Sequence, residues 1–225
     1  MPPPTRRTNA HPSPLRGLFR GEHSIAAPLN IDPAAAIYTT GDPDDALYHV
    51  ESGQVKVFMS SAGGKDCLID IYASGDIFGE TCLAAPGRRV ESATAMTRSV
   101  VQRLSRRELL AEVVRTDAMD ALLEHLALRM YERQIAVFDL VTMDSERRLV
   151  KVLLQLGRKL GVPDGPYLRI AHRISQEELA QIVGTTRPRI TAFMQRFRAG
   201  GIVATPTSRE LRIHRVKARE YLERV

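Results

Sequence analysis

The stretch ISQEELAQIVGTTRPRITAFMQRF, residues 174–197, decides the fold of the C-terminal part of this chain. Its apolar residues recur with the spacing of one helix face, on either side of Gly184. Glycine accepts the positive φ that ends a helix, so Gly184 separates two short helices. Thr186 is placed to be the N-cap of the second helix, and Pro188 falls in its first turn, where a missing N–H costs little. The pattern predicts a helix-turn-helix.

Polar and basic residues are left on the outer side of the second helix, near its start. They are Arg187, Arg189, Thr191 and Gln195. A recognition helix presents such side chains to base edges in the major groove of DNA. The alternative is a helical hairpin that only packs against the rest of the protein, and the basic residues favour DNA binding over that alternative.

The distribution of charge supports this interpretation. Residues 145–225 hold 17 basic and 7 acidic residues, a net charge of +10, whereas the rest of the chain, with 15 basic and 19 acidic residues, has a net charge of −4. A basic C-terminal part joined to an acidic N-terminal part is typical of a DNA-binding module attached to a sensing or assembly module.

The bulk composition is that of a globular protein with one or two domains. Of its 225 residues, 44% are hydrophobic and 26% are charged, and no apolar run of about 18 residues predicts a transmembrane helix. Residues 1–14 lack the apolar core of a secretory signal, and we expect a disordered tail over residues 1–20. Two cysteines, Cys67 and Cys82, make no disulfide framework, which indicates a reducing cytoplasm.

Residues 37–104 have the pattern of short strands. Apolar runs at 47–50, 55–58 and 68–72 are separated by Gly and Asp pairs every 8–12 residues. This spacing predicts an antiparallel sandwich or barrel.

A long helix is predicted over residues 117–143, which contain no Gly or Pro. Apolar residues fall on a heptad seam, with Arg133 as its polar member. The seam residues are Leu123, Leu126, Met130, Val137 and Leu140. We expect a parallel dimer along this seam; the alternative is a helix packed on its own domain.

The remaining segments complete a winged DNA-binding domain. A helix is predicted over 145–160, and two short strands at 200–204 and 211–214 flank a polar turn with Arg209 and Arg212 placed for phosphate contacts. The predicted fold class is α+β. We expect a disordered tail at 1–20, a β-roll sensor domain at 21–116, a dimerisation helix at 117–144 and a winged helix-turn-helix at 145–225.

Three motifs resemble those of bacterial CRP/FNR-type transcription regulators, in the same order and spacing. Residues 47–57 (LYHVESGQVKV) resemble the family's strand–glycine–strand signature, residues 75–80 (GDIFGE) the start of its cyclic-nucleotide phosphate cassette, and the helix-turn-helix its DNA reader. The resemblance implies a jelly-roll sensor, a long dimer helix and a homodimer that binds a near-palindromic operator. It also implies a cytoplasmic protein that contacts RNA polymerase.

The resemblance also implies roles at the DNA surface. Arg187 matches the family's guanine-reading arginine, and arginine suits the O6 and N7 acceptors of guanine. Pro188 stands where a cytosine-reading glutamate is common, and Ala192 where a second arginine is common, which puts the usual TGTGA-type half-site in doubt. Arg189, Thr191 and Gln195 are further candidates for base contacts; for Arg189 a surface ion pair is the alternative. The candidates for phosphate contacts are Thr185, Thr186 and Gln176.

In cyclic-AMP-binding relatives, a Gly-Glu pair begins the cassette and an Arg-Ser-Ala triplet ends it. Here Gly79 and Glu80 are present, but the triplet is Glu91-Ser92-Ala93. A carboxylate repels a phosphate, so Glu91 disfavours cyclic AMP. Arg88 and Arg89 lie close in sequence and are expected to reach the pocket only if the loop is rearranged.

The helix positions that meet the adenine in those relatives are Arg133 and Gln134 here. Arg133 is a candidate ligand for another anion, or it pairs with Glu80, Glu91 or an acid of a partner chain. A small-molecule effector in this pocket is possible, and its identity stays open.

Haem and redox chemistry are alternatives for the sensor. His49 and His125 are candidate haem ligands, and Cys67 with Cys82 a candidate redox pair. A cyclic dinucleotide, 2-oxoglutarate or no effector at all remain open. An enzyme is disfavoured because no catalytic motif is present, and the positive charge of the C-terminal part argues against a regulatory module that controls a partner protein without binding DNA.

Overall fold

A computed structural model of the chain describes residues 13–19, 27–84, 87–172, 174–207 and 210–223. The described chain forms two compact units, one running to Ile135 and the other starting at Ala136. The division falls within helix α2 (Met119–Thr142). No described helix is both long and apolar enough to cross a membrane.

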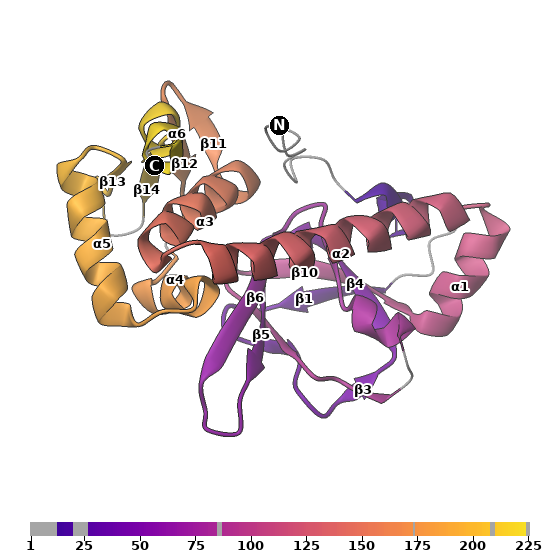
Figure 1. Ribbon diagram of the computed structural model, residues 1–225. Coiled ribbons are helices and arrows are strands. Elements are labelled where there is room, and N and C mark those ends of the chain that lie inside the picture. The colour runs from indigo at the N-terminus through magenta and orange to yellow at the C-terminus, as the bar shows by residue number, and fades with distance from the viewer. Residues whose placement is uncertain (1–12, 20–26, 85–86, 173, 208–209, 224–225) are drawn as a thin grey trace. The chain divides into compact units, whose positions relative to one another are not determined.

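Two antiparallel four-stranded sheets make up the N-terminal unit and form a jelly-roll-like β-roll, as predicted (Figure 1). The first sheet has the order β1 (Ala27–Ile31), β10 (Ser99–Ser105), β4 (Ala46–Ser52) and β7 (Ile77–Phe78). The second has the order β2 (Ala36–Tyr38), β9 (Ser92–Ala95), β5 (Gln54–Ser60) and β6 (Asp66–Ala73). β3 (Pro43–Asp44) pairs with β8 (Gly87–Arg88), and the short 3₁₀ helix η2 (Glu80–Leu83) follows β7.

The core of the β-roll is built from side chains that alternate along the strands. Val55 and Val57 of β5 are buried, while Lys56 between them is half-buried. They pack with Val50, Phe78 and other apolar residues of both sheets in one cluster. Burial of alternate residues is what a strand with one face on a core requires.

Residues 14–19 correct the expectation of a disordered tail up to residue 20. They form the 3₁₀ helix η1 (Pro14–Phe19), whose Leu15, Leu18 and Phe19 are buried against the core. Their i, i+3, i+4 spacing is the signal that the composition of the tail concealed. Residues 1–12 and 20 lie outside the described part of the chain.

Two helices follow β10. Helix α1 (Arg106–Arg115) begins at a capping box, in which Ser105 and Glu108 satisfy each other's backbone N–H groups. Helix α2 turns Leu122 and His125 inward, where both are buried.

The face of α2 that covers the β-roll corrects the expected heptad seam. Leu126 packs against the core of its own unit, and Arg133 donates a hydrogen bond to the Ile69 carbonyl of β6 (3.1 Å). The other four seam residues, Leu123, Met130, Val137 and Leu140, are 57%, 61%, 61% and 55% exposed. An outward, mainly apolar stripe therefore follows the 4,3 spacing of a heptad, with Gln134 as its polar member. Its apolar members are Leu123, Ala127, Met130, Val137 and Val141.

The C-terminal unit is a winged helix-turn-helix. It contains helices α3 (Ser145–Leu160), α4 (Gln176–Val183), α5 (Arg187–Ala199) and α6 (Arg215–Glu223) and one antiparallel sheet (Figure 1). Helices α3, α5 and α6 contact the sheet, and α4 packs against α3 and α5. The strands of the sheet have the order β11 (Val162–Asp164), β12 (Tyr167–Ile170), β14 (Leu211–His214) and β13 (Val203–Ala204). The two predicted wing strands are thus half of a four-stranded sheet. Arg209, in the expected wing turn, lies outside the described residues.

Arg148 of α3 joins three helices. Its guanidinium donates to the carbonyls of Asp139 (3.3 Å), Leu140 (3.1 Å) and Met143 (2.8 Å) at the end of α2, and to that of Val183 (2.6 Å) at the end of α4. The last carbonyls of a helix have no partner within it, and a cation there also opposes the helix dipole. The Arg148 side chain therefore joins the end of α2 to the end of α4, the first helix of the helix-turn-helix.

Candidate nucleic-acid interface and effector pocket

The turn between α4 and α5 is built as its sequence predicts. Gly184 has φ 71° and ψ 46°, and its N–H and that of Thr185 both donate to the Ala180 carbonyl (3.0 Å each). Thr186 has the extended conformation of an N-cap, but its side chain makes no capping bond. Thr186 is therefore the N-cap that the sequence predicts, although its exposed side chain does not contribute a capping hydrogen bond.

Helix α5 is anchored by one apolar face. Ile190, Phe193, Met194 and Phe197 are all buried at 7% exposure or less. Because these four share one side of the helix, the opposite side is presented outward. Arg187, Arg189 and Gln195 are exposed there, as are Pro188 and Ala192.

Arg189 and Thr185 line a hollow of about 630 Å³ between the start of α3 and the helix-turn-helix. Asp144 and Glu146 lie on its other side. Among the described residues, no acidic side chain is within 4.0 Å of the Arg189 guanidinium. Arg189 is therefore not held in a surface ion pair with a described residue, which was the alternative to DNA contact.

Thr191 and Gln176 are brought together, although they are fifteen residues apart. The Thr191 hydroxyl is 2.6 Å from Gln176 Oε1 and 3.0 Å from the Arg187 carbonyl oxygen. Both side chains are half-buried. A hydroxyl that donates inward in this way is not presented to base edges, so the structure gives Thr191 a different role from that of Arg187.

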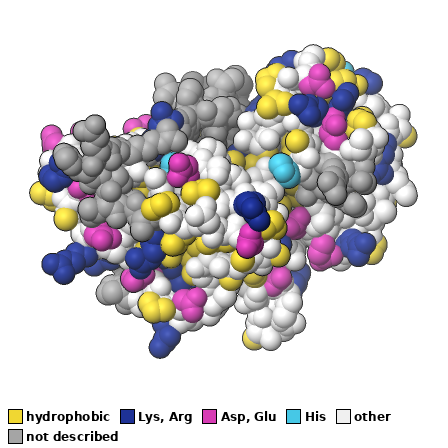
Figure 2. Space-filling view, turned by 180° about the vertical axis from the view of Figure 1, so that it is seen from behind, with side chains coloured by type: hydrophobic (Ala, Val, Ile, Leu, Met, Phe, Trp, Pro, Cys, Tyr) yellow, Lys and Arg dark blue, Asp and Glu magenta, His cyan; other side chains and the backbone are white. Residues whose placement is uncertain are grey.

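Other basic residues of the unit are paired within it. Arg196 lies over the Phe193 ring and forms an ion pair with Glu146 of α3. Arg212, expected at a phosphate, donates to Glu210 (2.6 Å) and lies 3.6 Å from Asp164. Basic and acidic side chains are also interspersed on the face in Figure 2, so positive charge alone does not locate the DNA site.

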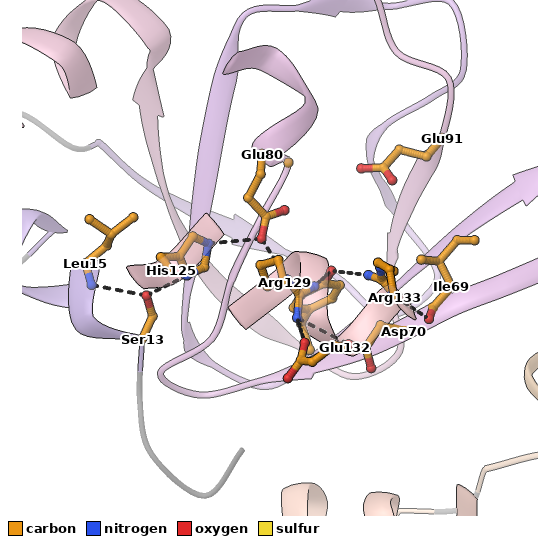
Figure 3. Close-up of polar contacts among 12 residues, drawn as sticks. Ser13, Leu15, Ile69, Asp70, Glu80, Glu91, His125, Arg129, Glu132 and Arg133 are labelled. Atoms are coloured by element: carbon orange, nitrogen blue, oxygen red, sulfur yellow. Dashed lines mark hydrogen bonds and ion pairs between the residues drawn. The ribbon is translucent and has the colours of Figure 1, made fainter. Parts of the chain in front are cut away.

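Glu80 in the β-roll is the centre of a polar cluster (Figure 3). Its Oε1 accepts from His125 Nε2 (3.1 Å) and pairs with Arg129 Nε (3.0 Å), both from α2. Arg129 also contacts Asp70 (3.6 Å) and the Tyr72 hydroxyl. Burial alone would raise the pKa of Glu80, but the bond from His125 and the charge of Arg129 outweigh burial and lower it.

Arg89 reaches the cassette without any rearrangement, which corrects the expectation from its sequence. Its side chain is 1% exposed and pairs with Asp44 (2.7 Å), and its Nη1 donates to the Gly79 carbonyl (3.2 Å). A second bond joins it to the Ala46 carbonyl, and its guanidinium lies 4.1 Å from the centre of the Tyr38 ring. Arg88 instead is exposed and donates to the Gly41 carbonyl (2.6 Å).

Glu91 is oriented toward Tyr38, whose hydroxyl donates to it at 2.8 Å. Burial raises the pKa of this carboxyl, and the hydrogen bond from Tyr38 only partly opposes the rise. Figure 3 shows no contact between Glu91 and the Glu80 cluster. Ser92 accepts from the backbone N–H of Thr40 (2.9 Å), and Ala93 is buried in the core.

Sequence reasoning missed the two α2 residues that hold Glu80. His125 was considered only as a haem ligand, and Arg129 was not considered. Arg133, a candidate anion ligand or ion-pair partner of Glu80, Glu91 or a partner-chain acid, donates to the Ile69 carbonyl, and Gln134 is exposed. Arg129 and His125 lie one and two turns before Arg133, on the inward face of α2. That periodicity was the available signal.

The candidate haem ligands and the candidate redox cysteines lie in different environments. His49 is fully buried, stacks on Phe19 and has its Nδ1 3.1 Å from Gln102, while both ring nitrogens of His125 are engaged by Ser13 and Glu80. Cys82 is buried in the core and its pKa is raised by burial to about 12. Cys67 is exposed, and both thiols are free.

Two family models match the chain. The cyclic nucleotide-binding domain matches residues 28–116, and the Crp-like helix-turn-helix domain matches residues 147–225. A sensor of the cyclic-nucleotide-binding type joined to a winged DNA reader defines a class of transcription regulator.

Relatives and solved structures place the chain more narrowly. A CRP-like cAMP-activated global transcriptional regulator of Mycobacterium tuberculosis is 32% identical, over 80% of this chain and 85% of that protein. A CRP-family transcriptional regulator of Thermus thermophilus is 26% identical, with a TM-score of 0.70 over 87% of this chain and 96% of that one. CooA of Carboxydothermus hydrogenoformans, 21% identical, shares the fold with a TM-score of 0.75 over 96% and 98% of the two chains. The chain belongs to the CRP/FNR family of bacterial transcription regulators, and its relatives are regulators rather than enzymes.

Proposed function

We propose that this protein is a sequence-specific transcription regulator that binds a near-palindromic operator as a homodimer. The observation that carries the proposal is the exposed basic start of α5, with Arg187 presented on a helix whose opposite face is anchored in the core. A helix held in this way has a fixed register in the major groove. We infer that it acts in the bacterial cytoplasm and contacts RNA polymerase there.

The homodimer is supported by the outward stripe of α2. Met130 and Val137 are each 61% exposed and Val141 is 78% exposed. Apolar residues at heptad spacing on an exposed helix face are stabilised by packing against a second such helix. A two-fold dimer carries two recognition helices, which explains why the operator should be near-palindromic.

The operator is expected to differ from the common half-site of the family. Pro188 has no donor or acceptor in its side chain, and Ala192 has none either, so two positions at the exposed surface of α5 carry no hydrogen-bond readout. Arg187, Arg189 and Gln195 remain for base contacts. Thr185, Thr186 and Gln176 are assigned to phosphates, which position the protein but carry no sequence information.

The test is Arg187→Ala, measured on an operator selected from random DNA and on an unrelated duplex. Loss of a bidentate guanine contact costs about 1–3 kcal/mol, so specific affinity should fall roughly 5- to 150-fold while non-specific affinity changes little. Arg198→Ala, an exposed arginine in the last turn of the same helix, is the matched control and should retain selectivity. Equal losses of Arg187→Ala on both duplexes would show that Arg187 contacts phosphate only.

For the effector we propose that cyclic AMP does not bind as it does in cyclic-AMP receptors. Arg89 is already neutralised by Asp44, Glu80 is already held by His125 and Arg129, and Glu91 adds a carboxylate near the cassette. A cyclic phosphate and its ribose would have to replace these contacts, at the cost of buried ion pairs. Calorimetry with cyclic AMP should show no binding at micromolar concentrations, and a micromolar Kd would overturn this proposal.

A further inference from the structure

Thr191 lies in the second turn of α5, and Gln176 is the first residue of α4. The hydrogen bond between Thr191 Oγ1 and Gln176 Oε1, at 2.6 Å, links the side chains of the two helices directly. The Arg187 carbonyl oxygen lies 3.0 Å from the same hydroxyl, and because a hydroxyl has a single hydrogen, the shorter contact with Gln176 is its main hydrogen bond. The hydroxyl is therefore held inward, toward Gln176.

This contact fixes which end of the Gln176 amide is free to reach DNA. A glutamine amide has an acceptor oxygen and a donor NH₂ group, and these lie on opposite sides of the amide carbon. When the oxygen accepts from Thr191, the NH₂ group is turned away from Thr191. DNA phosphates accept hydrogen bonds and donate none, so only the NH₂ end makes a favourable contact.

We propose that Thr191 is a positioning residue, which sets the Gln176 amide with its NH₂ group toward a DNA phosphate. The proposal rests on the DNA-reading function proposed above and replaces base contact as the role of Thr191. It assigns the pair to affinity and not to sequence selectivity, because phosphate contacts are the same on every sequence.

The experiment is a double-mutant cycle on the full-length protein, using Thr191→Val, Gln176→Ala and both together. Affinities are measured on the selected operator and on an unrelated duplex. Valine keeps the shape of threonine but removes the hydroxyl, so we expect a loss of about three- to ten-fold on both duplexes, the value of one hydrogen bond. In the Gln176→Ala background, Thr191→Val should cause no further loss, because the group that it positions is gone.

Two variants separate positioning from a structural role. Thr191→Ser keeps the hydroxyl and should restore the binding that valine loses. Thr116→Val, at the C-cap of α1, removes a hydroxyl that also donates to the carbonyl four residues earlier, that of Glu112 (2.8 Å), and it should leave affinity unchanged. A fall in thermal stability without coupling to Gln176 would mark a merely structural residue and would overturn the proposal.

Further outcomes are decisive. Wild-type affinity for Thr191→Val, or losses that multiply in the double variant, would contradict positioning. A loss confined to the selected operator would show that Thr191 reads a base. If Thr191→Val does not fold, Gln176→Glu provides the test: a carboxylate has no donor, so it should bind both duplexes more weakly than Gln176→Ala, and equal affinities would refute the proposed orientation. Failure of the proposed function itself would look different, since the wild type would then select no operator.

Discussion

Glu91 and Glu80 are both buried carboxyls near one cassette, yet their pKa values move in opposite directions. Glu91 has one hydrogen bond from a neutral hydroxyl, which does not offset burial, whereas Glu80 has an imidazole and a guanidinium. The difference shows that the hydrogen-bond or ion-pair partner, and not burial, decides whether the pKa of the carboxyl rises or falls. It also gives the two residues opposite effects on stability as pH changes.

Glu91→Gln should stabilise the protein at neutral pH. The raised pKa of Glu91 means that the folded state binds its proton more tightly than the unfolded state, so the stability contributed by protonation is present at low pH and lost as pH rises through the folded pKa. Glutamine mimics the protonated form and still accepts from Tyr38. Thermal unfolding should show a higher Tm than wild type at pH 7 and no difference near pH 4; a lower Tm at pH 7 would contradict the assignment.

Glu80→Gln should have the opposite effect. The lowered pKa of Glu80 means that its stabilisation is present above the unfolded pKa and is lost as pH falls through the folded pKa. Removing the charge weakens the bonds to His125 and Arg129, at a cost of about 1–3 kcal/mol at pH 7. Denaturant unfolding measures this cost, which should shrink in acid. A cost that does not depend on pH would show that packing, and not charge, is lost.

At the scale of elements, helix α2 serves two surfaces. Its inward face holds Leu122, His125 and Arg129 against the β-roll, while its outward stripe is apolar and exposed. Because an α-helix has 3.6 residues per turn, successive residues lie about 100° apart around its axis. Residues one position apart therefore lie on different faces. A heptad count from sequence alone therefore placed Leu126 and Arg133 on the outward seam, whereas both contact the β-roll.

Met130→Asp should weaken the proposed dimer. A carboxylate in the centre of a helix–helix seam is buried without a partner, which costs several kcal/mol in the dimer and nothing in the monomer. Sedimentation velocity should show monomers at concentrations where the wild type is dimeric. Leu128→Asp, which replaces a 43% exposed leucine away from the stripe, is the control. Dissociation by both variants, or by neither, would remove the stripe as the interface.

Local patterns in the sequence predicted elements well where one residue determines the backbone. Gly184 ended α4 as expected, and the apolar spacing from Ile190 to Phe197 defined the buried face of α5. Contacts between distant segments were not predictable in the same way. Arg89 contacts Asp44, and Thr191 contacts Gln176, because of how the strands and helices pack. The sequence separation of neither pair predicts the contact.

At the scale of the whole molecule, a β-roll in which Glu80 and Arg89 are internally paired is joined to a helix-turn-helix in which Arg187 and Arg189 are exposed. Helix α2 contributes to both compact units, and Arg148 fixes its end to α3 and α4. Helix α2 therefore runs from the unit that contains Glu80 into the unit that contains the helix-turn-helix.

The most direct measurement is selection of binding sites by the full-length protein from a pool of random duplex DNA, followed by sequencing. A dimeric reader with two recognition helices should enrich a near-palindrome, with half-sites centred about one DNA turn apart, roughly 10 base pairs. Arg187→Ala should lose a guanine preference at the same position in both half-sites. Enrichment of no sequence, or of a single half-site without a dyad, would contradict the account.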